Sequence, residues 1–75
     1  MQPEQQQPDN GTPLSSLQRD ILDCLIRGQS DKEIASRLQL SLHKVDYHLR
    51  QLRRRFAVRN RVQLVNAAVQ ASAMD

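Results

Sequence analysis

The sequence predicts an all-α domain, a four-helix bundle with a central helix-turn-helix. From residue 14 onward, apolar residues recur at intervals of three and four, as on one face of a helix, and the alternation typical of strands is absent. Each of four such stretches begins just after a Ser or Asn at the position of an N-cap. A chain of 75 residues has room for one small domain.

The N-terminal segment differs in composition from the rest of the chain. Residues 1–13 hold all three prolines and four glutamines, and they contain no residues that would build an apolar core. We expect a disordered tail or linker there, followed by a single domain over residues 14–75.

The first helix is expected at about 16–27. Ser15 with Gln18 three residues later is a capping-box pattern, and Gly28 suits the left-handed residue that follows a helix end. The apolar residues that define its buried face are Leu17, Ile21 and Leu25.

The second helix is short and is expected at about 31–38. Ser30 and Glu33 form another capping box, and Asp31 in the first turn is favoured by the helix dipole. Its apolar residues are Ile34, Ala35 and Leu38. A helix of this length depends on tertiary packing.

The third helix is expected at about 42–56, with Ser41 as its N-cap. One face is apolar and is formed by Leu42, Val45, Leu49, Leu52 and Phe56. The opposite face is polar and largely cationic, and consists of His43, Lys44, Tyr47, Arg50, Gln51 and Arg54. The pattern predicts a helix that contributes to the core on one side and presents cations on the other.

The connection between the second and third helices is about three residues long. So short a connection makes the two helices cross steeply, as in a helix-turn-helix. Ala35 is small enough to allow close approach at the crossing, and Leu40 is placed to fill the space between the helices.

The fourth helix is expected at about 61–72, after Asn60 as N-cap. It is apolar on two sides, which exceeds what its own core needs and indicates a partner. One side carries Val62, Val65 and Val69, and the second side, the candidate partner face, carries Leu64, Ala67, Ala68 and Ala71. Alternatively, the alanines are present because they favour helix formation.

Positive charge is concentrated in the second half of the chain. The net charge is +3, and it divides into −2 for residues 1–40 and +5 for residues 41–75. This asymmetry indicates either a polyanionic partner or a solvated basic face.

Several other classes of protein are disfavoured. We expect no enzymatic activity, no metal site and no cofactor, because the chain has no Gly-rich phosphate loop and its single Cys and two His lack ligand spacing. No apolar run is long enough to span a membrane. The lone Cys24 fits a cytoplasmic location.

The motifs as a set resemble the LuxR-type DNA-binding domain of bacterial transcription regulators, also called the GerE or FixJ/NarL type. The resemblance extends from Leu14 to about Val69. The matching features, in order, are Leu14-Ser15, Ile21-Leu22, Gly28, Lys32-Glu33-Ile34-Ala35, Leu38, Leu40-Ser41, Val45, His48 and the close from Val58 to Arg61. The resemblance implies that the third helix enters the major groove of double-stranded DNA, and that a homodimer forms through the fourth helix.

The resemblance also implies roles for individual residues. The base-facing positions fall on Asp46, Tyr47 and Arg50. The candidates for phosphate contacts are Lys44, His48, Arg54 and Arg61. His48 at this place is equally compatible with a structural role, and Tyr47 with a surface residue that covers its neighbours.

Several positions depart from the family pattern, among them Leu17 and Gln18, which stand where charged residues are usual. Lys44 stands where Thr is usual, Asp46 where Lys is usual, and Gln39 where the turn often has Gly. Asp46 is repelled by phosphates, yet it can accept a hydrogen bond from cytosine or pair with Arg50 one turn later. Gln39 carries a strain of roughly 1 kcal/mol if its φ is positive.

Two other functions remain open. The domain could act as a small antagonist that pairs with a larger LuxR-type regulator, and Asp46 favours this alternative. It could instead resemble the promoter-reading domain of an RNA polymerase sigma factor, but Gly28 and the Val58–Arg61 segment favour the LuxR type. For a DNA-binding regulator, RNA polymerase or a larger regulator is a further candidate partner.

Overall fold

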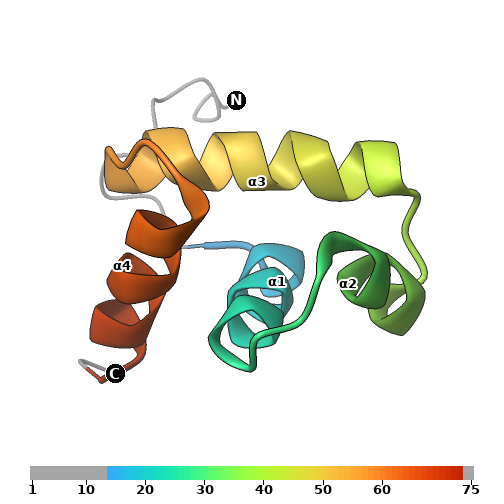
Figure 1. Ribbon diagram of the computed structural model, residues 1–75, viewed down its shortest axis with the longest axis horizontal. Coiled ribbons are helices and arrows are strands. Elements are labelled where there is room, and N and C mark those ends of the chain that lie inside the picture. The colour runs from blue at the N-terminus through green and yellow to red at the C-terminus, as the bar shows by residue number, and fades with distance from the viewer. Residues whose placement is uncertain (1–13, 74–75) are drawn as a thin grey trace, which may run out of the picture.

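The computed structural model describes residues 14–73, and over that range the chain forms four α-helices and no strand (Figure 1). The helices are α1 (Ser16–Ile26), α2 (Asp31–Leu38), α3 (Leu42–Phe56) and α4 (Arg61–Ala73). The all-α prediction is confirmed. The bounds of α2 and α3 are those predicted, whereas α1 ends one residue earlier and α4 one residue later. The tail expected at residues 1–13 lies outside the described residues.

Each helix begins at the N-cap that the sequence predicts. The side-chain oxygens of Ser15, Ser30, Ser41 and Asn60 each accept a hydrogen bond from the backbone N–H three residues later, over 2.9–3.2 Å. Glu33 completes the box at α2, because its carboxylate accepts from the N–H of Ser30 at 2.7 Å. These bonds satisfy N–H groups that the helices themselves leave unpaired.

The first three helices end in the same way. Gly28, Gln39 and Ala57 follow α1, α2 and α3 with φ of 81°, 58° and 57°. The next residue then donates its N–H to a carbonyl five residues back, as Gln29 does to Cys24 and Leu40 to Ala35. This closing pattern needs a left-handed residue. The prediction for Gly28 is confirmed, and Gln39 adopts the positive φ that carries strain.

The core lies between all four helices. Its buried residues are Ile21, Leu22, Cys24, Leu25, Ile34, Ala35, Val45, Leu49, Leu52, Leu64 and Ala68. Leu17 and Leu40 pack against this cluster, as expected for Leu40 between α2 and α3. Leu42 is 49% exposed, so its assignment to the apolar face of α3 was wrong. It is the first residue of α3, at the end of the helix where the buried stripe has not yet begun.

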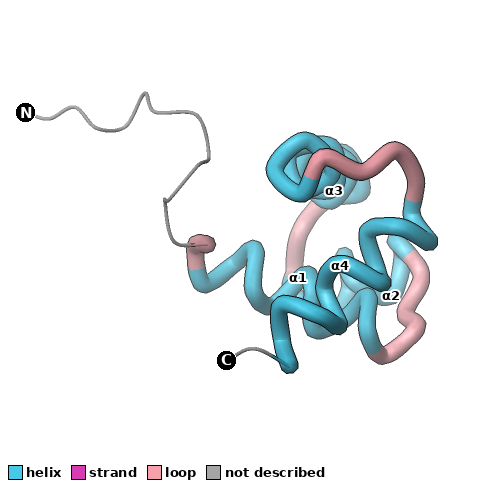
Figure 2. Tube along the Cα trace, turned by 90° about the vertical axis from the view of Figure 1, so that its left-hand side faces the viewer, coloured by secondary structure: helices cyan, strands magenta, loops and turns pink. Residues whose placement is uncertain are grey.

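α3 runs along the longest dimension of the molecule, and the other three helices lie on one side of it (Figures 1 and 2). α2 and α4 both contact α3, and α1 contacts α4 and α2. Figure 2 looks nearly along α3 and shows that the other helices leave its far side uncovered by the described chain. The other three helices therefore lie on one side of α3, and its polar side faces outward.

Candidate nucleic-acid interface

The outward side of α3 carries the polar residues that the sequence placed there. Tyr47 is 50% exposed, and the side chain of Arg50 is 58% exposed. His43, Lys44 and Arg54 are exposed as well. On the opposite side, the buried residues of α3 are Val45, Leu49 and Leu52. Packing of this apolar stripe fixes the rotation of the helix, so the polar stripe is held outward on a rigid element.

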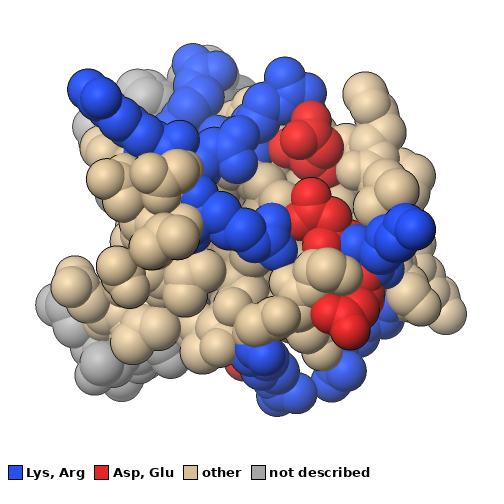
Figure 3. All heavy atoms as spheres, viewed as in Figure 1, with Lys and Arg blue, Asp and Glu red and all other residues tan. Residues whose placement is uncertain are grey.

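The basic residues of α3 are concentrated toward its C-terminal end. Three arginines, Arg53 to Arg55, lie in its last turn, where cations interact favourably with the helix dipole. Figure 3 shows Lys and Arg side chains gathered over one half of α3, with Asp and Glu side chains toward the middle of the same face. A surface of this kind attracts a polyanion, and the acidic groups limit how much of it is uniformly positive.

Two of the expected base-facing residues form an ion pair. Oδ2 of Asp46 lies 2.9 Å from Nη2 of Arg50, one helical turn away. Both side chains remain more than half exposed. The pairing that the sequence offered as one alternative for Asp46 is therefore present.

His48 is half-buried beside Tyr47, and the two rings meet edge to face with centroids 5.3 Å apart. Its Nδ1 is buried and has no hydrogen-bond partner. Burial lowers the pKa of His48, and the charge of Lys44 lowers it further. A neutral ring with its proton on Nε2 fits this site, because a buried unpaired acceptor costs less than a buried unpaired N–H or a buried charge.

Arg61 is engaged inside the domain. Its Nη1 lies 2.6 Å from Oδ1 of Asp31, and its Nη2 donates to the carbonyl of Gln29 at 2.9 Å. The guanidinium thus joins the first turn of α4 to the start of α2. Two of its donors are occupied, which weighs against the phosphate contact expected for it.

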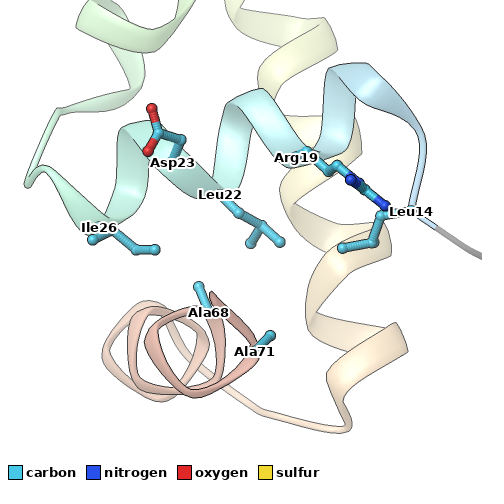
Figure 4. A pocket seen from close by; sticks show the side chains of 7 residues that line it. All are labelled: Leu14, Arg19, Leu22, Asp23, Ile26, Ala68 and Ala71. Atoms are coloured by element: carbon cyan, nitrogen blue, oxygen red, sulfur yellow. The ribbon is translucent and has the colours of Figure 1, made fainter. Parts of the chain in front are cut away.

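The structure corrects the expected dimer face of α4. Leu64 and Ala68 are 0% and 2% exposed and belong to the core, so they have no surface to offer a second chain. Figure 4 shows Ala68 and Ala71 pointing from α4 toward α1. Ala67 is half-buried. The exposed apolar residues of α4 are Val62 and Val69, at 71% and 46%.

Between α1 and α4 the surface is hollowed over about 220 Å³ (Figure 4). Two charged residues, Arg19 and Asp23, line the hollow together with five apolar residues, which are Leu14, Leu22, Ile26, Ala68 and Ala71. Among residues 14–73, no cluster of His, Cys, Asp and Glu could hold a metal ion. Over the same range, every helix is too short or too polar to cross a bilayer.

Comparison with known proteins agrees with this geometry. Residues 12–68 match the GerE family, described as "Bacterial regulatory proteins, luxR family". The chain belongs to this family.

A relative in Escherichia coli (strain K12) is named "Putative HTH-type transcriptional regulator YhjB". This LuxR-family domain is 48% identical to it over 50 residues, which cover 67% of this chain and 25% of the relative. The chain thus aligns with about a quarter of that protein. No solved structure shows a significant match.

Sequence reasoning missed two features of the LuxR-family domain. The first is the exposed pair Val62 and Val69, which the pattern placed on the side of α4 opposite the candidate dimer face. The second is the contact of Arg61 with Asp31, which are 30 residues apart in sequence. A signal for the first was present, since Leu64 is the only large aliphatic residue of α4 apart from its valines and therefore the best candidate for the core.

Proposed function

We propose that this LuxR-family domain binds specific sequences in double-stranded DNA as part of a bacterial transcription regulator, with α3 in the major groove. The observation that carries the proposal is the outward polar face of α3, held by a fully apolar inner face. An α-helix fits the major groove of B-DNA, and its N-terminal half reaches the base edges. Family membership supports the same conclusion.

Within this proposal, the exposed residues of α3 divide into two groups. Asp46, Tyr47 and Arg50 lie in its N-terminal and middle turns and face the bases. Lys44 and Arg54 contact phosphates, which contributes affinity without reading sequence. Burial lowers the pKa of His48 in the free domain, and a neutral ring there can donate a hydrogen bond from Nε2 to the DNA backbone.

We also propose that the domain pairs with a second copy of itself on DNA through α4. Val62 and Val69 support this proposal, because they lie two turns apart and are exposed apolar residues on one side of the helix. A two-fold pair would place two copies of α3 on related half-sites. In this proposal the two valines form the interface in place of Leu64, Ala68 and Ala71. Ala67 lies at the edge of that interface.

A second function is favoured by one observation. The Asp46–Arg50 ion pair cancels charge on the reading face, which would suit an antagonist that pairs with a larger LuxR-type regulator and binds DNA weakly. In either function we propose a cytoplasmic location, where DNA and RNA polymerase are both accessible. Contact with RNA polymerase belongs to the regulator proposal alone.

The test is selection of bound duplexes from a random DNA pool, followed by salt titration. Enrichment of a two-fold related site and a steep loss of affinity with salt are the expected results, because binding releases counterions from phosphates. Arg54→Ala should reduce the slope of log K against log salt by about 1 while leaving the selected site unchanged. No enrichment, with tight binding to a larger family member, would establish the antagonist instead.

A further inference from the structure

The ion pair between Asp46 and Arg50 occupies the middle of the proposed reading surface. Oδ2 of Asp46 and Nη2 of Arg50 are 2.9 Å apart, and the two side chains are 55% and 58% exposed. A role for this pair in reading bases deepens the proposed function and rests on it.

The direction in which side chains leave a helix brings the pair toward the N-terminal half of α3, which is the part expected to reach the base edges. Side chains lean toward the N-terminus, so the guanidinium of Arg50 lies over the turn that carries Asp46. The carboxylate holds one nitrogen of the guanidinium and restricts a long, flexible side chain. The remaining N–H groups of Arg50 are still able to donate, and the second carboxylate oxygen of Asp46 is still able to accept.

We propose that Asp46 and Arg50 act as one base-reading unit. Arg50 donates two hydrogen bonds to O6 and N7 of a guanine, in the geometry that suits its planar fork. Asp46 holds Arg50 in that orientation and accepts a hydrogen bond from N4 of a cytosine in an adjacent base pair. Each half-site then contains a guanine next to a pair whose cytosine amino group faces Asp46.

The charges of this unit affect specific and nonspecific DNA binding differently. The pair is close to neutral, so it adds little to the general attraction for phosphates. Asp46 alone is repelled by every phosphate, whatever the sequence. A carboxylate in this position therefore weakens binding to random DNA, and in a domain that reads DNA its expected benefit is discrimination between sequences.

The experiment compares wild type with Asp46→Ala on two duplexes, the selected site and a random sequence, at one low salt concentration. We expect Asp46→Ala to bind the random duplex more tightly, because a negative charge is removed. We expect the ratio of the two affinities to fall at least about fivefold, as loss of a good base contact requires. An unchanged ratio would mean that Asp46 acts only as a repulsive charge, and the unit would be rejected.

Modified bases test the partner of each side chain. Replacing the guanine by 7-deazaguanine removes the N7 acceptor and should weaken wild type but not Arg50→Ala. Methylation of the cytosine at N4 should weaken wild type and leave Asp46→Ala little changed. If a modified base weakens wild type and the matching variant equally, the proposed contact between that base and that side chain is wrong.

The matched control is Arg54→Ala, which removes an exposed charge of the same helix. It should weaken both duplexes by the same factor and leave their ratio unchanged. If wild type enriches no duplex at all, the proposed function fails, and the unit with it. If wild type enriches a site whose preference Asp46→Ala retains, only the unit fails.

Discussion

Arg61 in the first turn of α4 is bound to Asp31 in the first turn of α2, with Nη1 and Oδ1 2.6 Å apart. The same guanidinium also donates to the carbonyl of Gln29 in the connection between α1 and α2. The guanidinium therefore joins the N-terminal ends of α2 and α4, which are distant in sequence. Both ends belong to helices that pack against α3 on the side opposite its polar face. This arrangement gives Arg61 a structural role that can be separated from DNA binding.

Arg61→Ala should lower the free energy of unfolding by about 1 kcal/mol. The ion pair is partly exposed and contributes little alone, but the fork holds a carboxylate and a carbonyl together. For a domain of this size, the melting temperature should fall by roughly 4–8 °C. Thermal and urea unfolding measure the effect.

Arg61→Lys is the matched control, because it keeps the charge and loses the fork. Its stability should lie between those of wild type and Arg61→Ala. The slope of DNA affinity against salt should be unchanged in both variants. A slope reduced by about 1, with unfolding unaffected, would restore the phosphate contact expected from the sequence.

Substitutions of the left-handed residues after α1 and α2 should change the free energy of unfolding in opposite directions. Gly28→Ala should destabilise the domain by about 0.5–1 kcal/mol, because a side chain is strained at φ 81°. A Cβ at Gly28 would meet no atom within 4 Å, so the cost comes from the backbone alone. Gln39→Gly should stabilise by about 0.5 kcal/mol, since relief of strain exceeds the added entropy of the unfolded chain.

Urea unfolding of the two variants measures both effects on one scale. Ala57→Gly is the companion to Gln39→Gly, because Ala57 has nearly the same φ after α3. The two should shift stability in the same direction. A loss of stability in both would show that left-handed strain at these helix ends is smaller than the entropy that glycine adds.

The valines of α4 predict a separation of pairing from folding. Val69→Asp should reduce the association of two copies of the domain on a two-fold DNA site. Its free energy of unfolding should stay within about 0.5 kcal/mol of the wild-type value, as for other exposed positions. Leu64→Ala should instead lower stability by about 2–5 kcal/mol, because it removes a fully buried side chain. Sedimentation and cooperativity of DNA binding measure the pairing.

Gln70→Glu is the control for charge, since Gln70 is an exposed neighbour of Val69. It adds a negative charge without removing an apolar side chain and should leave cooperativity nearly unchanged. If Val69→Asp pairs as well as wild type does, the interface lies elsewhere and the α4 proposal is rejected.

Local features of the fold could be predicted from the sequence because their causes are local. Ser30 and Glu33 satisfy each other's backbone within one turn, and the N-cap oxygen of Ser41 acts within three residues. The inner and outer faces of α3 also followed from periodicity, because its sequence is apolar on only one side. The Asp46–Arg50 pair, one turn apart, was one of the two alternatives that the sequence offered for Asp46.

The orientation of α4 could not be predicted in this way. Both of its sides are apolar, so periodicity does not distinguish the side that packs on α1 from the side that faces solvent. That choice depends on how α4 crosses α1 and α3, which is a tertiary property. The contact between Arg61 and Asp31 depends on the same crossing.

His48 predicts a dependence of stability on pH. Burial lowers its pKa in the folded domain below the ordinary value of 6.5, so the unfolded chain binds a proton more readily. Stability therefore rises with pH between the folded pKa and about 6.5, and it is fully present above that window. As pH falls through the window, the domain should lose stability. Urea unfolding at pH 7.5 and 5.5 measures the loss.

His48→Gln removes the titrating group and should flatten this part of the pH profile. His43→Gln is the matched control, because His43 is an exposed residue of the same helix and its replacement leaves His48 in place. The control should keep the wild-type profile. Should His48→Gln retain the full pH dependence, another group would have to titrate in this range. The lowered pKa assigned to His48 in the folded domain would then be wrong.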